Sequence, residues 1–490
     1  MTAAACLWLA AAAAAQATAA PASAPVAAEL AGAWAGTAEH DGETTPFALE
    51  LEPQADGKLL LKATVPSAHF ERAPLGSVPV KQDGRRVTLG PFTFDYDRDA
   101  KTLAGVVPPD FAPVYRLPLL LRRVDRFEPP ARPAPGGALA EPVWSYDAGS
   151  PLWPGPSFAG GLVFTGAEDG QLHAVDARTG SKRWSFRAGG AVRTRPVIES
   201  GALFFQADDG FLYRLDAASG REAWRVRLAD KPVERLPFDN PKSRYDRFGS
   251  DVTVTGGRLY VGTHDGHVLA LDPATGARLW DFAAGDSVLA APSVDSGRVY
   301  AGSYDKHVYA LDAATGRLLW KRDTQGAVVS TPAVAGDVVV VGNRCYDLLG
   351  LHAATGEVAW KRYVWFSWVE SSATVVDGVA YVGSSDAASV GAFDARTGRP
   401  RWQADVYGWA WGQPAVAGDR VYMGTSSQAG YPAGHRAGVM ALERATGRVA
   451  WRYESPAAAK GAFGFPGSPA LGEGLVFVSG LDGRLHAFKL

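Results

Sequence analysis

An eleven-residue phrase recurs along most of this chain at nearly constant spacing. It reads ALDPATGARLW at residues 270–280 and ALDAATGRLLW at residues 310–320, and five close variants stand elsewhere in the 490 residues. The third residue is Asp in most copies, with Gly four positions and Trp eight positions after it. Self-similarity with a period of about forty residues indicates a fold built from copies of one small unit.

The residues that the copies share have a structural explanation. An Asp at a strand end accepts hydrogen bonds from the backbone of the following turn, and Gly adopts the left-handed conformation that closes it. Trp then begins the outermost strand, where its ring can cover the seam to a neighbouring unit. His352 and Glu443 replace the Asp in two copies, which argues against a metal or catalytic role. The residues with this structural role include Asp176, Gly180, Trp184, Asp272, Gly276, Trp280, Asp312, Gly316, Trp320, Asp394, Gly398 and Trp402.

The residues upstream of each phrase predict further strands. LYVGTHDGHVLALD at residues 259–272 is typical, because apolar and polar residues alternate on both sides of an Asp-Gly hairpin turn. Each unit therefore has four short strands, the make-up of a propeller blade. The tryptophans that mark the units are Trp144, Trp184, Trp224, Trp280, Trp320, Trp360, Trp402 and Trp451.

The two ends of the repeat region complement each other. Trp144 has no unit upstream, whereas the C-terminal LVFVSGLDGRLHAFKL stops before its tryptophan strand. Pairing of these ends makes an eighth blade and removes the exposed sheet edges of an open β-solenoid, the alternative architecture. We predict that residues 141–490 form an eight-bladed β-propeller of four-stranded antiparallel blades, closed by pairing of N- and C-terminal strands.

A different pattern precedes the repeat. Residues 30–125 hold short alternating runs separated by Asp-Gly turns, which predict a small antiparallel β domain. Its opening, GAWAGTAEHDGETTPFALEL, resembles the Gly-x-Trp-x-Gly strand of small β modules in many exported bacterial proteins. Residues 126–140 are rich in Pro, Gly and Ala and are predicted to be a linker. The chain is therefore predicted to be all-β.

The N-terminal residues bear on where the protein works. Residues 1–20 are small and apolar and end near an Ala-x-Ala site, which is typical of a signal peptide; an Ala-rich disordered leader is the alternative. We expect a periplasmic or secreted protein. Cys6 has too little sequence before it for a lipoprotein signal, and Cys345 is expected to be a buried thiol. No later segment is long and apolar enough to span a bilayer, and a net charge of −2 does not favour nucleic-acid binding.

The shared phrase, written ALDxxTGxxxW, resembles the PQQ-like β-propeller repeat. This family includes quinoprotein alcohol dehydrogenases and the BamB-type propellers of outer-membrane assembly. The resemblance covers residues 141–490 and implies eight blades. It leaves the function open, because the family holds both cofactor enzymes and binding scaffolds.

Residues that differ between the copies are the candidates for recognition. Twelve positions after the tryptophan, five copies have a Pro that begins the innermost strand, so the three residues before it should face the central channel or its rim. Aromatic and Arg side chains gather there and favour a planar anion, a sugar chain or a peptide; packing of the rings as filler is the alternative. The candidate rim residues are Trp153, Arg193, Arg195, Arg244, Asp251, Trp365, Trp368, Glu370, Trp409, Trp411 and Gln413.

These residues favour a scaffold over an enzyme. A quinone-dependent dehydrogenase needs pyrroloquinoline quinone (PQQ), Ca²⁺ held by oxygen ligands and a carboxylate base. Asp251 and Glu370 are the acids at the predicted rim, and neither the adjacent cysteine pair of that family nor a Cys-x-x-Cys-His haem motif occurs. We therefore expect no catalytic residue, metal or cofactor.

The predicted function is a non-catalytic, BamB-like binding scaffold in the cell envelope. Its partner at the rim would be a protein, an extended peptide or a polymer. The alternative is a PQQ-dependent alcohol or sugar dehydrogenase that binds quinone and calcium at the propeller mouth.

Overall fold

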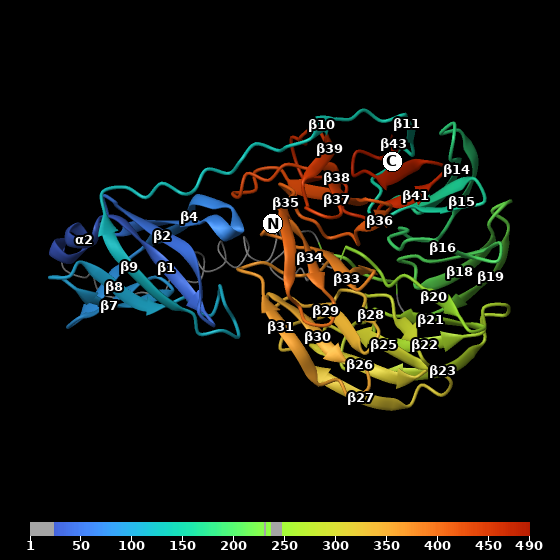
Figure 1. The fold of residues 1–490 in the computed structure, drawn as a ribbon, viewed down its shortest axis with the longest axis horizontal. Helices are drawn as coiled ribbons and strands as arrows, with labels where there is room; N and C mark the ends of the chain where they lie inside the picture. Colours follow the sequence, from blue (N-terminus) through green and yellow to red (C-terminus); the bar gives the residue numbers. More distant parts are fainter. Residues whose placement is uncertain (1–23, 230–231, 237–246) are drawn as a thin grey trace. The chain divides into compact units, whose positions relative to one another are not determined.

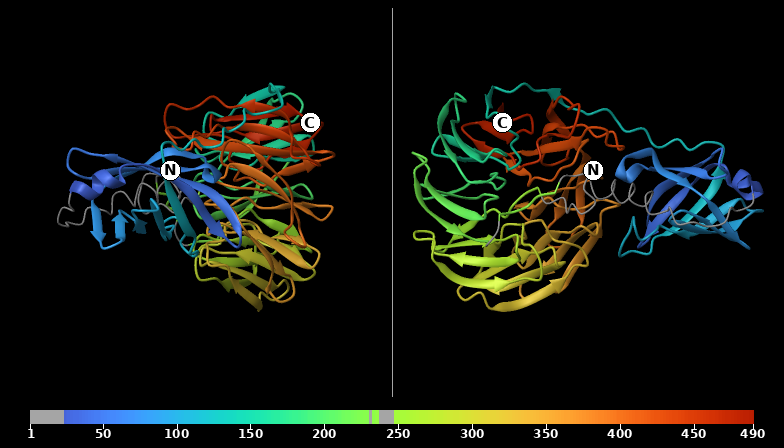
Figure 2. Two further views of the ribbon diagram at one scale, coloured as in Figure 1. Left: turned by 60° about the vertical axis from the view of Figure 1, so that its left-hand side comes forward. Right: turned by 180° about the vertical axis from the view of Figure 1, so that it is seen from behind.

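The computed structural model describes residues 24–229, 232–236 and 247–490, which form two compact units. The predicted signal peptide, residues 1–20, lies outside the described residues. Figures 1 and 2 show the strands of both units. The first unit comprises the described residues up to Ala134 with Trp365–Ser367 and Gly430–His435, and the second comprises those of Pro135–Val364, Trp368–Ala429 and Arg436–Leu490.

The first unit is one nine-stranded sheet in the order β4-β3-β2-β1-β9-β8-β7-β6-β5. Because β1 pairs with both β2 and β9, the first and last strands of the sheet are neighbours, and the consecutive strands β4 and β5 form its two edges. The sheet is thereby close to a barrel, which confirms the predicted small antiparallel β domain. The elements are α2 (Ala24–Leu30), β1 (Gly32–His40), β2 (Glu43–Pro53), β3 (Leu59–Val65), η1 (Pro66–Ala68), β4 (Phe70–Val78), β5 (Val80–Asp83), β6 (Arg86–Leu89), β7 (Phe92–Asp97), β8 (Thr102–Val106) and β9 (Pro118–Val124).

The Gly-x-Trp-x-Gly strand is the centre of this sheet. The indole N–H of Trp34 is fully buried and donates to the carbonyl oxygen of Leu30, 2.8 Å away at the end of α2. A Cβ atom at Gly36 would lie 1.8 Å from the carbonyl oxygen of Leu120 in β9. Only glycine therefore lets β1 and β9 approach closely enough to bring the sheet round on itself.

The second unit is an eight-bladed propeller, which confirms the predicted fold class. The blades follow one another around a ring (Figure 1), and each runs from a short innermost strand to an outermost strand that carries the repeat tryptophan. From the inside outwards the first four blades are blade 1 with β12 (Ser157–Ala159), β13 (Leu162–Gly166), β14 (Gln171–Asp176) and β15 (Lys182–Arg187), blade 2 with β16 (Val197–Glu199), β17 (Ala202–Gln206), β18 (Phe211–Asp216) and β19 (Glu222–Arg227), blade 3 with β20 (Thr253–Thr255), β21 (Arg258–Gly262), β22 (His267–Leu271) and β23 (Arg278–Ala283), and blade 4 with β24 (Ser293–Asp295), β25 (Arg298–Gly302), β26 (His307–Asp312) and β27 (Leu318–Asp323).

The next three blades repeat this arrangement. They are blade 5 with β28 (Ala333–Ala335), β29 (Val338–Gly342), β30 (Asp347–His352) and β31 (Val358–Tyr363), blade 6 with β32 (Thr374–Val376), β33 (Val379–Gly383), β34 (Ser389–Asp394) and β35 (Pro400–Asp405), and blade 7 with β36 (Ala415–Ala417), β37 (Arg420–Gln428), β38 (Gly438–Glu443) and β39 (Val449–Glu454). Blade 7 gains two short strands, β10 (Ala138–Leu139) on its outer edge and β40 (Ala462–Gly464) beside β37.

Blade 8 joins the two ends of the repeat region. Its inner strands are β41 (Ala470–Gly472), β42 (Leu475–Ser479) and β43 (Arg484–Lys489), and its outermost strand is β11 (Trp144–Asp147). β11 runs antiparallel to β43, with Trp144 opposite Ala487. One blade thus ties strands from both ends of the repeat region, which closes the ring.

The repeated phrase links each blade to the next, as blade 3 illustrates. Asp272 Oδ1 accepts hydrogen bonds from the backbone N–H groups of Ala274 and Thr275, each 2.8 Å away. Gly276 then adopts a φ of +74°. The indole N–H of Trp280 donates to the carbonyl oxygen of Ala313 in blade 4, at 3.1 Å. Equivalent indole bonds join six other pairs of blades, from Trp144, Trp184, Trp224, Trp320, Trp360 and Trp402.

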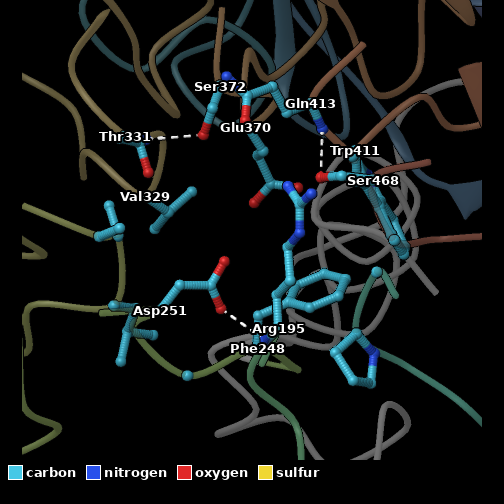
Figure 3. Close-up of a pocket in the computed structure, with 18 of the residues that line it drawn as sticks. Arg195, Phe248, Asp251, Val329, Thr331, Glu370, Ser372, Trp411, Gln413 and Ser468 are labelled. Atoms are coloured by element: carbon cyan, nitrogen blue, oxygen red, sulfur yellow. Dashed lines mark hydrogen bonds between the residues drawn. The ribbon is translucent and has the colours of Figure 1, made fainter. Parts of the chain in front are cut away.

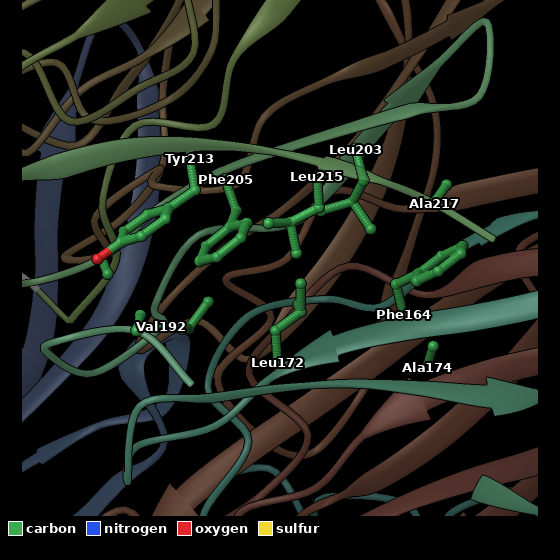
Figure 4. Packing of buried hydrophobic residues seen from close by; sticks show 11 residues of the cluster. Phe164, Leu172, Ala174, Val192, Leu203, Phe205, Tyr213, Leu215 and Ala217 are labelled. Carbon is green, nitrogen blue, oxygen red and sulfur yellow. The ribbon is translucent and has the colours of Figure 1, made fainter. Parts of the chain in front are cut away.

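The hydrophobic cores lie between neighbouring blades rather than within them. Figure 4 shows one such core, in which Phe164 and Leu172 of blade 1 face Leu203 and Phe205 of blade 2. Because each blade buries its apolar faces against both neighbours, the blades are held as one ring. The loops that enter the innermost strands are therefore fixed around a common centre.

Candidate functional site

A channel at the centre of the ring is the candidate site. It has a cavity volume of about 100 Å³, and every blade contributes to its wall through the residues just before its innermost strand. Figure 3 shows the charged side chains of Arg195, Asp251 and Glu370 pointing into it. The lining residues are Pro154, Gly155, Arg193, Arg195, Phe248, Gly249, Asp251, Leu289, Ala290, Ala291, Val329, Thr331, Glu370, Ser372, Trp411, Gly412, Gln413, Pro466, Gly467 and Ser468.

Arg195 and Asp251 meet in the channel wall through a hydrogen bond from the Arg195 backbone. Asp251 Oδ1 accepts a hydrogen bond from the backbone N–H of Arg195 at 2.7 Å, and the Arg195 Nε–H donates to Ser157 Oγ at 3.1 Å. Burial raises the pKa of Asp251 to about 6, against the opposing effects of the hydrogen bond and the positive charge of Arg195. The carboxyl group therefore changes its charge close to neutral pH.

Arg193 belongs to a buried cluster of charges beside the channel. Its Nε donates to Asp208 Oδ2 at 3.1 Å, and its Nη2 pairs with Glu168. Arg235 donates to both oxygens of Asp208, each at 2.9 Å. The Nη1 group of Arg193 is buried and has no hydrogen-bond partner among the residues that the structure describes. The guanidinium lies 5.8 Å from the ring centre of Trp153.

Glu370 is held by an arginine from the adjoining blade. Arg344 donates to Glu370 Oε1 through Nε at 2.6 Å and pairs with it through Nη2 at 2.5 Å. The same guanidinium lies over the ring of Trp368, 4.5 Å from its centre, and over that of Tyr304, at 5.0 Å. Trp368 is thus a packing surface for Arg344.

Trp411 gives the channel its aromatic wall. Its ring stacks on that of Trp409 with centres 4.8 Å apart and planes 11° from parallel. Its indole N–H donates to Ser385 Oγ at 3.2 Å. Beside it, the Gln413 side chain donates to the carbonyl oxygen of Ala373 at 3.1 Å. The Trp411 ring is therefore fixed on one side and lines the channel with the other.

The structure separates the candidate rim residues into three groups. Arg193, Arg195, Asp251, Glu370, Trp411 and Gln413 line the channel. Trp153, Trp368 and Trp409 are at least nine-tenths buried, as in the alternative in which the rings act as filler. Trp365 belongs to the first unit, and Arg244 lies outside the described residues.

Several residues of the site were missed by the sequence analysis. Glu168, Asp208, His264, Tyr304 and Arg344 all precede the tip of the hairpin between the second and third strands of a blade. A signal for them was present, because this position varies from copy to copy, and an Asp-Gly turn follows it directly in blades 1, 2 and 3. The channel loops were located by counting from the repeat tryptophan, and counting in the same way would also have located these hairpin residues.

The channel does not fit a quinone with calcium. Ligand pockets usually have volumes of about 300–1,000 Å³, several times the volume found here. Of the two channel carboxylates, Glu370 is paired with Arg344 and Asp251 with the Arg195 backbone. Across the ranges that the structure describes, no group of three or more His, Cys, Asp or Glu residues could hold a metal ion.

Two further sequence expectations concern single features. Cys345 is a buried free thiol, as predicted. Within the described part of the chain, no helix has the length and apolar character needed to cross a membrane.

Eight four-stranded blades around a polar channel place this protein among the repeat β-propellers. The model of the family described as outer membrane protein assembly factor BamB matches residues 138–237, 216–374 and 364–490. These matches cover more than half of the chain, so the protein belongs to this family of PQQ-like, BamB-type propellers.

Solved structures with the same fold include natural proteins of different kinds and a designed protein. BamB from Moraxella catarrhalis is 19% identical, with a TM-score of 0.55 and coverage of 72% of this chain and 100% of that chain. A quinohemoprotein alcohol dehydrogenase from Pseudomonas putida is 14% identical, with a TM-score of 0.52 and coverage of 73% and 78%. The computationally designed Ika8 protein is 16% identical, with a TM-score of 0.59 and coverage of 71% and 99%. At such identities the likeness shows the fold alone.

One curated relative matches over a short stretch. Lupanine 17-hydroxylase [cytochrome c] from Pseudomonas sp is 47% identical over 45 residues, which are 9% of this chain and 6% of that protein. Because so little of that protein is matched, its activity gives no direct guide to this one.

Proposed function

We propose that the protein is a non-catalytic binding scaffold of the cell envelope, which presents the mouth of its central channel to a partner protein. The observation that carries this proposal is the pair of guanidinium groups that blade 2 places in the channel wall, Arg193 and Arg195. At the equivalent positions, blade 4 has the apolar Leu289 and Ala291. A buried donor without an acceptor costs about 1–3 kcal/mol. An acceptor brought by a partner to Nη1 of Arg193 would remove this cost.

An extended peptide segment suits these groups better than a compact cofactor. Backbone carbonyl and carboxylate oxygens accept hydrogen bonds from guanidinium groups, and the Trp411 wall offers a flat apolar surface beside them. A cavity of about 100 Å³ has room for a side chain or a chain end. We therefore expect a partner to insert one acceptor-bearing group at the mouth rather than to fill the channel.

The sequence and the comparisons support the envelope location and the scaffold role in different ways. The small, apolar residues 1–20 support export to the periplasm or out of the cell. The match to the family model described as outer membrane protein assembly factor BamB supports the scaffold role. The PQQ-dependent dehydrogenase is the alternative, and it has only the fold in its favour, because the channel lacks the volume and the free carboxylates for quinone and calcium.

Site-specific photo-crosslinking in cells tests the proposal. A photoreactive residue at Thr331, in the channel wall, should capture a partner, whereas the same residue at the exposed Thr355 on an outer turn should not. The substitution Arg195→Gln should lower the yield at Thr331 by about tenfold. Equal capture at both positions, or capture unaffected by Arg195→Gln, would contradict a role for the mouth.

A second experiment addresses the enzyme alternative. Purified protein is mixed with PQQ and Ca²⁺, and quinone absorbance and alcohol-dependent dye reduction are followed. We expect neither stoichiometric quinone binding nor turnover. Both together would overturn the scaffold proposal.

A further inference from the structure

The linker segment before the propeller adds a strand to one blade. β10 pairs in parallel with β39, the outermost strand of blade 7, with Ala138 opposite Trp451 and Leu139 opposite Arg452. The backbone N–H of Ala140 donates to the carbonyl oxygen of Arg452 at 2.8 Å. The outer edge of blade 7 is therefore already a site that binds an extended segment.

Two side chains of β39 hold this segment in place. Arg452 Nη1 donates to the carbonyl oxygens of Gly136 and Gly137, each at 2.8 Å. Gly137 has a φ of +79°, and a Cβ atom there would lie 2.8 Å from Val449 Cγ1. The segment thus needs a glycine where it crosses Val449, two positions before Trp451. Its backbone carbonyl oxygens accept hydrogen bonds from Arg452, one position after Trp451.

The same pair of residues recurs on blade 4. Leu318 stands two positions before Trp320 and Lys321 one position after it, matching Val449 and Arg452 around Trp451. β27 is the outer edge strand of its sheet, and no strand of the described residues covers it. The Leu318 side chain is 39% exposed, although it is large and apolar. Blade 5 has the same pattern in Val358 and Lys361, but Lys361 lies 3.4 Å from Asp347.

Other blades protect this edge. The residue two positions before the tryptophan is Lys182, Glu222 and Arg278 in blades 1, 2 and 3, and Pro400 in blade 6. Charged residues and proline are the usual means of keeping an edge strand from pairing with another chain. An apolar residue at the equivalent position in blade 4 is therefore a departure from the protection seen in blades 1, 2, 3 and 6.

We propose that the outer edge of β27 binds an extended segment of a partner protein in parallel, as β39 binds residues 136–140. The segment has a glycine over Leu318, a small residue opposite Trp320 and backbone carbonyls that accept from Lys321. Ladder hydrogen bonds supply the affinity, and the glycine requirement supplies the selectivity. This surface is separate from the channel mouth, so the proposal goes beyond the proposed function and does not depend on it.

The probe is a synthetic peptide with the sequence of residues 133–142, PAPGGALAEP, bearing a photo-crosslinker in place of Ala140. It is added to the full chain, and the adducts are mapped by mass spectrometry. We expect adducts on β27. Either Leu318→Lys or Lys321→Glu should lower their yield by about tenfold. Glu222→Lys, on the charged edge of blade 2, should leave the yield unchanged, as should Arg195→Gln in the channel.

A peptide with Gly137→Val is the matched control for the ligand and should give no adducts on β27. Adducts spread evenly over the outer strands, adducts on β39 alone, or no adducts would overturn the proposal. Concentration-dependent dimers that disappear in Leu318→Lys would show that the occupant is a second copy of this chain, which would overturn the assignment to a partner protein. Loss of crosslinking at Thr331 with unchanged adducts on β27 would contradict the proposed function of the channel mouth and would leave the β27 proposal intact.

Discussion

The indole N–H of Trp280 in blade 3 donates to the carbonyl oxygen of Ala313 in blade 4, at a distance of 3.1 Å. Its ring covers Gly316 in the same turn of blade 4. This relationship, repeated between seven pairs of blades, turns the strongest feature of the sequence into contacts between units. It therefore stabilises the ring on which any channel site depends.

Substitution of Trp280 should separate the contributions of ring packing and hydrogen bonding. Trp280→Ala is expected to lower the free energy of unfolding by about 3–5 kcal/mol, the usual effect of removing a large buried ring. Trp280→Phe keeps an aromatic ring but loses the N–H donor, and should cost about 1–2 kcal/mol. Urea denaturation followed by circular dichroism measures both. A Phe variant as stable as the wild type would show that the indole hydrogen bond contributes nothing.

A pair of glycines tests the contact beneath the ring. Gly316 and Gly297 have nearly the same φ, +73° and +74°. A Cβ atom at Gly316 would lie 2.7 Å from the Trp280 ring, whereas a Cβ atom at Gly297 would have no atom within 4 Å. Replacement by Ala should cost about 1 kcal/mol of backbone strain at Gly297. At Gly316 we expect a further loss of about 1–3 kcal/mol from overpacking. Equal losses in thermal or urea unfolding would mean that Trp280 moves aside freely.

Asp251 should make the stability of the propeller depend on pH. Its pKa in the folded protein is about 6, above its ordinary value of 3.8. Folding therefore favours the protonated carboxyl group. The stability that Asp251 contributes is fully present below about pH 4 and is lost as the pH rises through 6. Asp251→Asn should raise the free energy of unfolding at pH 8 by about 1–3 kcal/mol, and the gain should vanish near pH 4. A gain that is constant between these pH values would contradict the assignment.

The Asp208 carboxylate should be essential to the buried cluster. It accepts hydrogen bonds from both Arg193 and Arg235, whose side chains are 8% and 6% exposed. Asp208→Ala leaves these guanidinium groups without their shared partner and should cost about 3–5 kcal/mol in urea denaturation.

Asp147→Ala is the matched control for an exposed ion pair. Asp147 and Arg484 lie 3.7 Å apart and are both more than half exposed. Removal of the Asp147 carboxylate should change the free energy of unfolding by less than about 1 kcal/mol. Similar effects of the two substitutions would argue against a structural role for the buried cluster.

Cys345 should be unreactive in the folded protein. Its side chain is buried and its S–H donates to the carbonyl oxygen of Gln325 at 3.2 Å, while burial raises its pKa to about 11. Thiol reagents react with the thiolate, so a Cys6→Ser variant should react very slowly at pH 8 and rapidly once unfolded in urea. Fast labelling under native conditions would show that the region around Cys345 opens.

The sequence by itself determined the architecture of the propeller. Each blade is a local unit of the chain, and the constant distances between Asp, Gly and Trp reflect contacts that every blade makes in the same way. Counting from Trp184 or Trp402 therefore reaches the loops that contain Arg195 and Trp411, both of which line the channel.

Only the tertiary structure decided which charged and aromatic groups meet. Glu370 and Arg344 come from different loops, and nothing in their local sequences shows that they pair. Likewise, the backbone N–H of Trp409 donates to the carbonyl oxygen of Ser426 at 2.9 Å, and its ring is fully buried. Alternation and turn motifs describe each strand and its nearest neighbours, whereas the channel and the strand added by residues 138–139 are produced by contacts between distant parts of the chain.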